Sequence, residues 1–358
     1  MLKKIAEWFN LPSAGEATFE ARDPGPMTPP TDQDYVFTTD LVQKGLMWLD
    51  KRIGAPNLLL TGPTGAGKSS FAEQLCARTG HQVWRVPCHG RMEFQELVGG
   101  FKLAMRQAVH EERARKAQAP AKGFAALVDV FERLIVAIKG AVGVGPETVF
   151  VHGALARAAM EGGVLLLDEV NFAPPPMLGA LNTVADRGTL IIPETGEVIQ
   201  ISPDFHIAAT GNSVQRGNDA ALYRGTQAMN IAFVDRFLTA EVGYLDPVTE
   251  SLILHRKTDD IRKPNGTNAL DAPTIEAMIA LANEVREMHQ AGEMETTLST
   301  RALVRWARVY LNAPVKRLES NAQKIAKWSL DFAHLEGVKP EERESIHRMI
   351  ELRFVGSA

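Results

Sequence analysis

The chain has 358 residues, of which 45% are hydrophobic and 23% are charged, so it is long enough to bury the cores of two domains. Its 43 acidic and 39 basic residues give a formal net charge of −4, which argues against a dominant nucleic-acid-binding surface. No apolar run reaches the ~20 residues that span a bilayer. Cys76 and Cys88 are the only cysteines, and they do not form a CxxC pair, so we expect a cytoplasmic protein with reduced thiols and no membrane association.

Residues 1–34 are predicted to form a flexible N-terminal tail or linker, because prolines concentrate among small and acidic residues over positions 11–34. Residues 2–10 before them have the spacing of a short amphipathic helix. A disordered tail is one interpretation of this segment. The other is a docking peptide in which Trp8 and Phe9 anchor a partner.

Residues 35–245 alternate between short apolar runs and helical stretches. The runs, which we expect to be strands, cover positions 57–61, 83–86, 164–167 and 205–210. Short, fully apolar strands separated by helices indicate a parallel sheet covered on both faces, the core of an α/β fold. Residues 188–203 differ, because two β-rich stretches flank Glu194-Thr-Gly196, a pattern typical of a hairpin.

Positions 101–147 interrupt this alternation. A charged helical stretch from Phe101 to Lys116 and an amphipathic one from Phe124 to Ala141 predict a helical insertion in the core. Two interpretations are open: the insertion packs locally, or it forms an arm that faces a partner or a neighbouring subunit.

Residues 246–358 have a helical pattern throughout, which predicts a separate lid domain. Asp271 and Ser299 are N-cap candidates for two of its helices. A last pair of helices is expected over positions 319–333 and 340–354.

The segment Gly62-Pro-Thr-Gly-Ala-Gly-Lys-Ser69 fits the phosphate-binding pattern GxxxxGK[ST] in full, between a predicted strand and a predicted helix. Its glycines allow backbone N–H groups to converge on phosphate oxygens at the positive end of a helix. Lys68 is expected to reach the β- and γ-phosphates, and Ser69 to give its hydroxyl to Mg²⁺. The nucleotide-binding residues predicted here are Gly62, Pro63, Thr64, Gly65, Ala66, Gly67, Lys68, Ser69 and Ser70.

Asp168 and Glu169 follow the apolar run 164–167, which places them at the carboxyl end of a central strand. Open α/β sheets bind ligands at that edge. Asp168 is predicted to hold Mg²⁺, and Glu169 to orient and deprotonate the attacking water. Phosphoryl transfer depends mainly on positioning and charge neutralisation, so this division of roles suffices.

Two polar residues downstream are candidates for the same site. Asn212 follows the run 205–210, where its amide could contact the γ-phosphate and the lytic water; the alternative is a turn residue. Arg236 is a candidate arginine finger that a neighbouring subunit would place on the γ-phosphate. The alternative for Arg236 is a surface ion pair with Asp235.

In the lid, Arg301 lies in the first turn of the helix predicted to follow Ser299, and it shares one helix face with Arg305 and Arg308. Such a basic face is ordinarily solvated. The alternative is that Arg301 reaches a bound nucleotide and reports its state to the lid.

Taken together, these motifs resemble the MoxR-type branch of the AAA+ ATPases, and most closely the small ATPase subunit of aerobic cobaltochelatase. The resemblance covers about residues 35–312. It rests on the P-loop, on Asp168-Glu169, on Ala209-Thr-Gly-Asn212 and on Leu298-Ser-Thr-Arg301. Its most specific part is Gly217-Asn-Asp-Ala-Ala-Leu-Tyr-Arg-Gly-Thr-Gln227.

The resemblance implies an AAA+ P-loop NTPase with a five-stranded parallel sheet, helix-2 and pre-sensor-1 hairpin inserts, and a C-terminal helical lid. It also implies ATP and Mg²⁺ as cofactors and assembly into a ring, usually a homo-hexamer. By this resemblance the site residues are Lys68 and Ser69 of Walker A, Asp168 and Glu169 of Walker B, Asn212 as sensor 1, Arg236 as arginine finger and Arg301 as sensor 2. Family members typically work with a protein partner that carries a von Willebrand factor A-type domain.

Several functions remain open at this point. The first is a ring-forming ATPase that remodels or activates a partner protein, and the second is the motor subunit of an aerobic cobaltochelatase. The third is a nucleic-acid translocase, but its candidate pore segment, residues 90–101, holds two acids and one base, which weighs against phosphate tracking. A scaffold that binds nucleotide without turnover would show a broken Walker B motif or finger, whereas these residues look complete.

Overall fold

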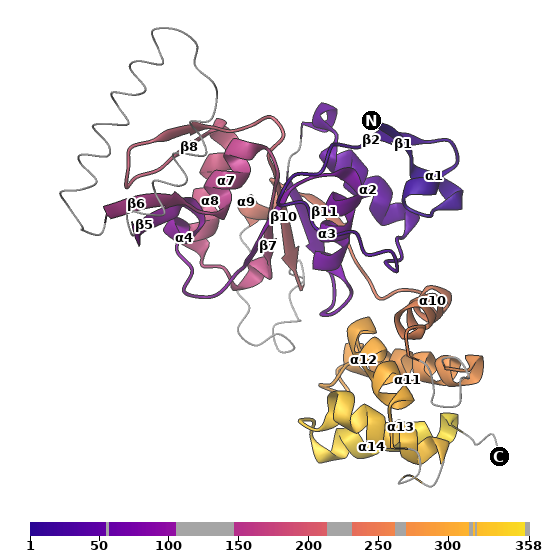
Figure 1. Ribbon diagram of the computed structural model, residues 1–358. Coiled ribbons are helices and arrows are strands. Elements are labelled where there is room, and N and C mark those ends of the chain that lie inside the picture. Colours follow the sequence, from indigo (N-terminus) through magenta and orange to yellow (C-terminus); the bar gives the residue numbers. More distant parts are fainter. Residues whose placement is uncertain are drawn as a thin grey trace, which may run out of the picture.

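The computed structural model describes residues 1–54, 57–104, 147–212, 231–261, 270–314, 318 and 321–354 of the protein. A five-stranded parallel sheet with the order β11–β3–β10–β7–β4 lies at the centre of its α/β part (Figure 1). The strands are β3 (Asn57–Thr61), β4 (Val83–Pro87), β7 (Val164–Asp168), β10 (His206–Gly211) and β11 (Leu238–Glu241). The first four occupy the apolar runs that the sequence predicts to be strands, so the parallel α/β core is confirmed.

Both faces of this sheet are covered by helices. Successive side chains of a strand point to opposite faces, so each central strand contributes to two hydrophobic clusters. Leu58 and Leu60 belong to one hydrophobic cluster with α2 and α3, and Leu59 and Leu165 belong to a second cluster with α7 and α8. The helices of the α/β part are α2 (Thr39–Leu49), α3 (Lys68–Thr79), α4 (Phe94–Val98), α7 (Ala154–Glu161), α8 (Pro175–Arg187) and α9 (Ile231–Val234). This burial on both faces explains why the central strands are fully apolar in sequence.

The strand pairs β5–β6 and β8–β9 are antiparallel and lie outside the central sheet. β8 (Thr189–Ile191) pairs with β9 (Val198–Gln200), which confirms the hairpin predicted around Gly196. β5 (Gly99–Ala104) pairs with β6 (Glu147–His152), so the helix predicted to begin at Phe101 is wrong for residues 101–104. Phe101 lies opposite Phe150, and their rings meet edge to face at 5.3 Å, a cross-strand contact that stabilises the extended form. The remainder of the predicted helical insertion, residues 105–146, lies outside the described residues.

The N-terminal segment packs against the core. β1 (Leu2–Lys4) and β2 (Thr18–Glu20) form an antiparallel pair, and α1 (Ile5–Trp8) lies between them in the chain. Phe9 is only 2% exposed, and its ring contacts the rings of Phe19 and Phe37. This corrects the expectation of a flexible tail or linker over residues 1–34. The proline-rich composition does not reveal that Phe9 and its apolar neighbours join the hydrophobic cluster of α2 and α3.

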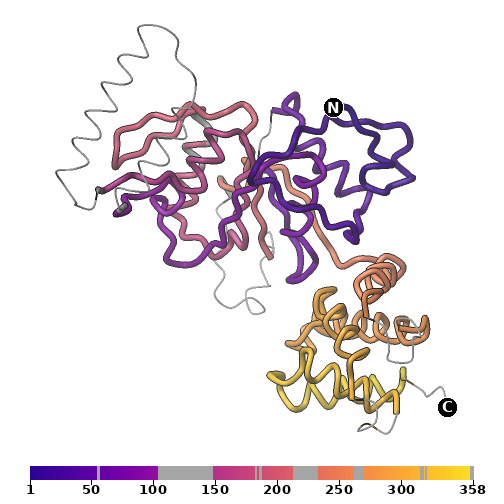
Figure 2. Tube along the Cα trace, viewed as in Figure 1, coloured from indigo at the N-terminus to yellow at the C-terminus, as the bar shows by residue number. Residues whose placement is uncertain are grey.

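The C-terminal part, orange to yellow in Figure 2, is helical. It has a hydrophobic cluster of its own, which includes Trp306, Leu330 and Ile346. Ser299 caps its third helix, because the Ser299 hydroxyl accepts a hydrogen bond from the N–H of Ala302 at 3.2 Å. The helices are α10 (Pro247–Thr258), α11 (Ala272–Gln290), α12 (Thr300–Leu311), α13 (Ala322–Leu330) and α14 (Pro340–Arg353), with a π-helical turn at Asp331–Leu335.

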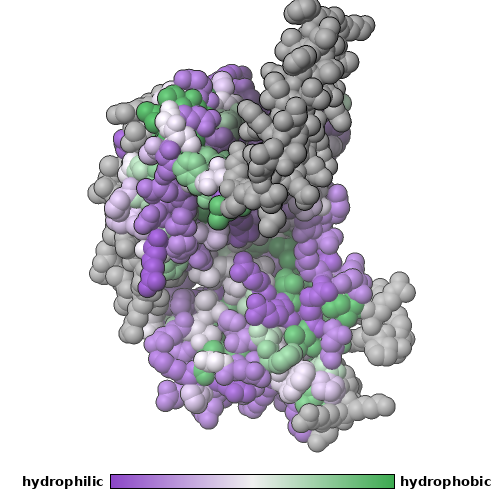
Figure 3. Space-filling view, turned by 60° about the vertical axis from the view of Figure 1, so that its left-hand side comes forward, coloured by the Kyte–Doolittle hydropathy of each residue, from purple (hydrophilic) through white to green (hydrophobic). Residues whose placement is uncertain are grey.

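The face of the molecule seen in Figure 3 is largely hydrophilic, with hydrophobic residues in smaller groups. None of the helices within the described ranges combines the length and the apolar character that a membrane span requires.

Candidate functional site

The P-loop joins β3 to the start of α3. Gly62, Gly65 and Gly67 have positive φ angles of 140°, 75° and 93°, which a residue without a Cβ atom adopts most easily. At Gly62 a Cβ would lie 2.1 Å from the carbonyl oxygen of Val242, and at Gly65 it would lie 2.4 Å from the Cβ of Ser299. Glycine is therefore required at these two positions both by the backbone conformation and by the close approach of neighbouring segments.

Lys68 begins α3, and its ammonium group lies inside the loop. Its Nζ donates to the carbonyl oxygens of Gly62 and Pro63, both at 2.8 Å, and to the Oδ1 of Asn212 at 3.4 Å. Burial lowers the pKa of Lys68 to about 8, although the carboxylates of Asp168 and Glu169 act in the opposite direction. The structure thus brings the predicted Walker A lysine and the predicted sensor 1 asparagine together.

Asp168 ends β7 and is held by hydroxyl and guanidinium donors. Ser69 and Thr210 each donate to its Oδ1, at 2.5 and 2.6 Å, and the Nε of Arg85 donates to its Oδ2 at 3.1 Å. Burial alone would raise the pKa of Asp168, but the hydrogen bonds from Ser69, Thr210 and Arg85 outweigh it and hold this pKa below its usual value. The carboxylate is therefore ionised at neutral pH and lies beside the Ser69 hydroxyl, as a metal-binding role requires.

Sequence reasoning missed Arg85 and Thr210. Arg85 lies on β4, next to β7 in the sheet, and also forms an ion pair of 3.1 Å with Glu73 of α3. The signal available for Arg85 is an arginine within an otherwise apolar strand; its side chain is 48% exposed, and its guanidinium pairs with carboxylates at the surface of the sheet. The position of Thr210 two residues before Asn212 carries no comparable signal.

Glu169 has an unusual backbone for a residue with a side chain. Its φ and ψ are 56° and 48°, in the left-handed region, and its N–H donates to the hydroxyl of Thr210 at 3.0 Å. The Thr210 hydroxyl therefore contacts both acidic residues: it donates to the carboxylate of Asp168 and accepts from the backbone N–H of Glu169. Strain of this kind is concentrated at functional sites, where the surrounding structure maintains it.

Arg236 lies at the amino ends of the strands, opposite the carboxyl ends where the P-loop lies. It precedes β11, and its carbonyl oxygen accepts a hydrogen bond of 3.2 Å from the side chain of Asn57, the first residue of β3. The P-loop follows the last residue of β3. The five residues of this strand, at ~3.3 Å each, separate its amino end from its carboxyl end by roughly 15 Å. The structure therefore brings together Lys68, Ser69, Asp168, Glu169 and Asn212 but does not bring Arg236 to the same P-loop.

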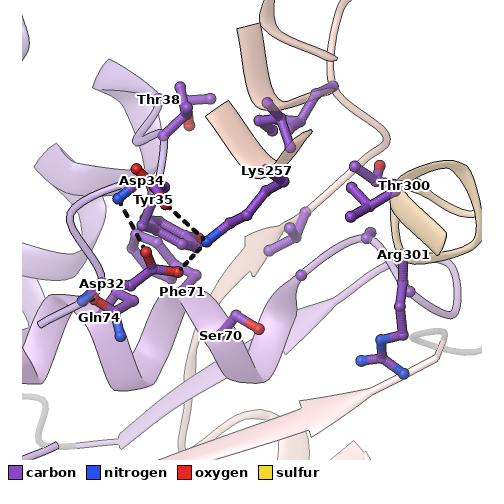
Figure 4. A pocket seen from close by; sticks show the side chains of 18 of the residues that line it. Asp32, Asp34, Tyr35, Thr38, Ser70, Phe71, Gln74, Lys257, Thr300 and Arg301 are labelled. Carbon is purple, nitrogen blue, oxygen red and sulfur yellow. Dashed lines mark hydrogen bonds and ion pairs between the residues drawn. The ribbon is translucent and has the colours of Figure 1, made fainter. Parts of the chain in front are cut away.

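A pocket of about 450 Å³ lies beside the P-loop, between the α/β part and the lid (Figure 4). It is lined by Tyr35, which precedes α2, by Gly67 and by Lys257 and Arg301 of the lid. The Nζ of Lys257 pairs with Asp32 at 2.7 Å across one side of this pocket. The predicted sensor 2 residue thus lines the same pocket as the P-loop, and the volume is in the range of small-molecule sites.

These groups fit a nucleoside triphosphate with Mg²⁺. A Cβ on Gly67 would meet no atom within 4 Å, so the backbone at the start of α3 is open to a ligand. Hydroxyl and carboxylate oxygens, here from Ser69 and Asp168, are the ligands that Mg²⁺ accepts in nucleotide sites, with phosphates completing its coordination. Within the described ranges, no group of three or more His, Cys, Asp or Glu side chains could hold a metal ion by itself.

The sequence matches two protein families. The family described as AAA domain, dynein-related subfamily, matches residues 57–135 and 129–237, and the family described as CbbQ/NirQ/NorQ C-terminal matches residues 265–317. Together these matches cover the P-loop, both acidic residues, Asn212, Arg236 and Arg301.

Similar proteins occur in staphylococci. An uncharacterized protein of Staphylococcus haemolyticus is 28% identical over 83% of this chain and 90% of its own length. Another, from Staphylococcus epidermidis, is 28% identical over 87% of this chain and 94% of its own length. Among solved structures, that of a candidate ATPase from Cytophaga hutchinsonii covers 87% of this chain and 92% of its own, at 16% identity and a TM-score of 0.37.

Proposed function

Because the chain belongs to the MoxR-type AAA+ ATPases, we propose that it hydrolyses ATP at the interfaces of a ring, a homo-hexamer, and uses the turnover to remodel or activate a partner protein. One observation carries this proposal. Lys68, Asp168 and Asn212 converge at the carboxyl ends of the strands, while Arg236 lies at their amino ends. In a ring of subunits arranged in this way, the guanidinium of Arg236 would reach the γ-phosphate of a neighbouring subunit and not that of its own.

In the proposed mechanism, Lys68 leaves the carbonyl oxygens of the P-loop and binds the β- and γ-phosphates of ATP. Ser69 and Asp168 would hold Mg²⁺, which when bound supplies charge neutralisation for the phosphates. Glu169 orients the attacking water and accepts its proton, and Asn212 hydrogen-bonds that water and the γ-phosphate. Arg236 of the adjacent subunit stabilises the negative charge of the transition state, an effect worth roughly 10³–10⁵ in rate in other systems.

A polypeptide is the partner that the surface favours. The antiparallel strand pairs β5–β6 and β8–β9 carry the exposed hydrophobic side chains Phe101, Leu103, Ile191 and Val198. Such side chains suit contact with a protein better than contact with a phosphate backbone, for which Lys and Arg are needed. We propose, from the resemblance of the sequence, that the partner carries a von Willebrand factor A-type domain. Cys76 and Cys88 are both buried and unpaired, which supports a reducing, cytoplasmic location.

The motor subunit of an aerobic cobaltochelatase is the second candidate, favoured by the stretch from Gly217 to Gln227, which lies outside the described residues. It shares the ATPase mechanism and differs only in the partner. Pull-down with the ATP-bound Glu169→Gln variant tests it: capture of a subunit that binds cobalt and a corrinoid would support it, and capture of an unrelated enzyme would exclude it.

Mixing two inactive variants tests the proposed interface. Glu169→Gln and Arg236→Ala should each lose ATP turnover by at least ~10³-fold when assembled alone. In mixed rings, an Arg236→Ala subunit receives an intact finger from a Glu169→Gln neighbour, so part of the activity should return. Activity that stays absent over all mixing ratios, while mixed rings are seen by native mass spectrometry, would contradict a finger acting between subunits. Glu293→Gln is the control, because Glu293 is an exposed residue of the lid that does not line the pocket.

A further inference from the structure

A fully buried ion pair lies in the lid, close to the P-loop. Glu250 of α10 and Arg286 of α11 are 1% and 3% exposed, and the guanidinium binds both carboxylate oxygens at 2.9 Å. Charges are costly to bury unless their hydrogen-bonding capacity is used. Here it is used: the Nε of Arg286 donates to the carbonyl oxygen of Leu298 at 2.6 Å, and the hydroxyl of Thr300 donates to Glu250 at 2.6 Å. The pair therefore fixes α10, α11 and the start of α12 relative to one another.

Tyr244 connects this ion pair to the P-loop. It lies in the segment between β11 and α10, which joins the α/β part to the lid. The guanidinium of Arg286 lies 4.1 Å from the centre of the Tyr244 ring, a cation–π contact. The Tyr244 hydroxyl donates to the carbonyl oxygen of Thr64 in the P-loop at 3.2 Å and lies 3.4 Å from the hydroxyl of Thr297. The Tyr244 side chain thus contacts the P-loop through its hydroxyl and the buried ion pair through its ring.

A second contact joins the same two regions. Ser299, the N-cap of α12, lies so close to Gly65 that a Cβ there would overlap it. Arg301 follows two residues later and lines the nucleotide pocket. Because Leu298 and Thr300 are bonded to the Arg286–Glu250 pair, any displacement of this pair relative to the P-loop also displaces Arg301.

We propose that Tyr244 is a positioning residue, which couples the conformation of the P-loop to the placement of Arg301 in the nucleotide pocket through the Arg286–Glu250 pair. This inference rests on the proposed function, since it takes ATP to bind at the P-loop. Lys68 now donates to the carbonyl oxygens of Gly62 and Pro63, adjacent to Thr64. When Lys68 turns to the phosphates, the hydrogen bonding of this stretch changes, and the Tyr244 hydroxyl transmits the change to the lid.

A double-mutant cycle tests the coupling. In the Glu169→Gln background, which prevents turnover, the affinity for ATP is measured by calorimetry with no further change, with Tyr244→Phe, with Arg301→Ala and with both. Tyr244→Phe removes only the hydroxyl and keeps the ring on Arg286, so the fold is preserved. We expect it to weaken ATP binding about three- to ten-fold, and Arg301→Ala about ten- to a hundred-fold. The double variant should be no weaker than Arg301→Ala alone, within about two-fold.

Full additivity would overturn the inference, because Tyr244 would then act on the P-loop without Arg301. A Tyr244→Phe variant that binds ATP as tightly as the background would also overturn it. If the background protein binds no ATP at all, the proposed function fails first, so the two failures are distinguishable. Tyr310→Phe is the matched control: it removes a tyrosine hydroxyl from α12 on a residue that packs against Phe354, and it should leave ATP affinity unchanged.

Hydrogen exchange gives a readout that a purely structural role would not change. In the background protein, ATP should slow exchange of the amides at the start of α12. In Tyr244→Phe this protection should be reduced, while exchange without nucleotide stays the same. Equal protection in both proteins would contradict the coupling.

Discussion

Glu169 has a left-handed backbone, a conformation that costs a residue with a Cβ atom roughly 1–2 kcal/mol. Replacing it with Gly and with Ala separates this strain from the loss of the carboxylate. Both variants should lose ATP turnover, because neither can accept a proton from water. Glu169→Gly should nevertheless be about 1 kcal/mol more stable than Glu169→Ala in urea unfolding, since Gly adopts this conformation freely. Equal stabilities would show that the backbone at this position is not strained in solution.

Lys68 provides a pH-dependent signature of nucleotide binding. Its pKa is about 8 in the nucleotide-free protein, so above pH 8 it is increasingly neutral. Phosphates favour the charged form and raise this pKa, so binding takes up a proton and the affinity for ATP falls as the pH rises above 8. At pH 8.5 we expect an uptake of about three quarters of a proton per ATP, measured by calorimetry in buffers of different ionisation enthalpy.

The same titration at pH 7 is its internal control. Lys68 is already charged there, so uptake should fall to about a tenth of a proton. A binding enthalpy that is independent of the buffer at both pH values would contradict the lowered pKa.

Among the elements, the N-terminal hairpin with α1 has the clearest stabilising role. Phe9 is buried between Phe19 and Phe37, so Phe9→Ala should lower the free energy of unfolding by about 3–5 kcal/mol. Urea denaturation followed by tryptophan fluorescence measures the change. Leu2→Ala, at a residue that is 72% exposed, should change stability by less than about 0.5 kcal/mol. A segment that behaved as a tail in solution would give equal, negligible effects for the two variants.

The elements of the fold differ in how far their sequences predict them, for physical reasons. Central strands such as 57–61 and 164–167 are buried on both faces, so their apolar runs are visible in sequence. β11 is an edge strand whose residues are mostly exposed, so its sequence, Leu-Thr-Ala-Glu, has no comparable pattern, and only the family resemblance implies a fifth strand. The N-terminal segment was predicted wrongly because burial of a few apolar residues against α2 and α3 depends on a surface that composition does not describe.

The site shows the same division. The P-loop, Asp168 and Asn212 are predictable because each lies at the carboxyl end of a strand. In a parallel sheet these ends lie on the same side, so the three meet there. Arg85 and Thr210 reach Asp168 from strands that are neighbours in space and distant in the chain. Such contacts depend on the strand order, which the apolar runs alone do not determine.

At the scale of the whole molecule, assembly should depend on the nucleotide. Because the proposed active site needs Arg236 from a second subunit, ATP bridges two subunits and favours their association by mass action. Glu169→Gln with ATP and Mg²⁺ should form closed rings by mass photometry, and the same protein with ADP should form fewer. Lys68→Ala, which removes the phosphate contact, is the control and should remain in smaller species with either nucleotide. Rings of equal abundance in all these conditions would argue that nucleotide does not bridge the subunits.

Arg236 and the P-loop of the same chain lie at opposite ends of the strands. This separation also has a genetic consequence. Every subunit would serve two reaction centres, its own through Glu169 and that of the next subunit through Arg236, so the loss of Arg236 impairs a neighbour that is itself normal. In a cell that makes normal and altered chains in equal amounts, most six-membered rings contain at least one altered chain. An allele with Arg236 replaced would therefore lower turnover by the normal chains in mixed rings, whereas an allele that only prevents folding would not.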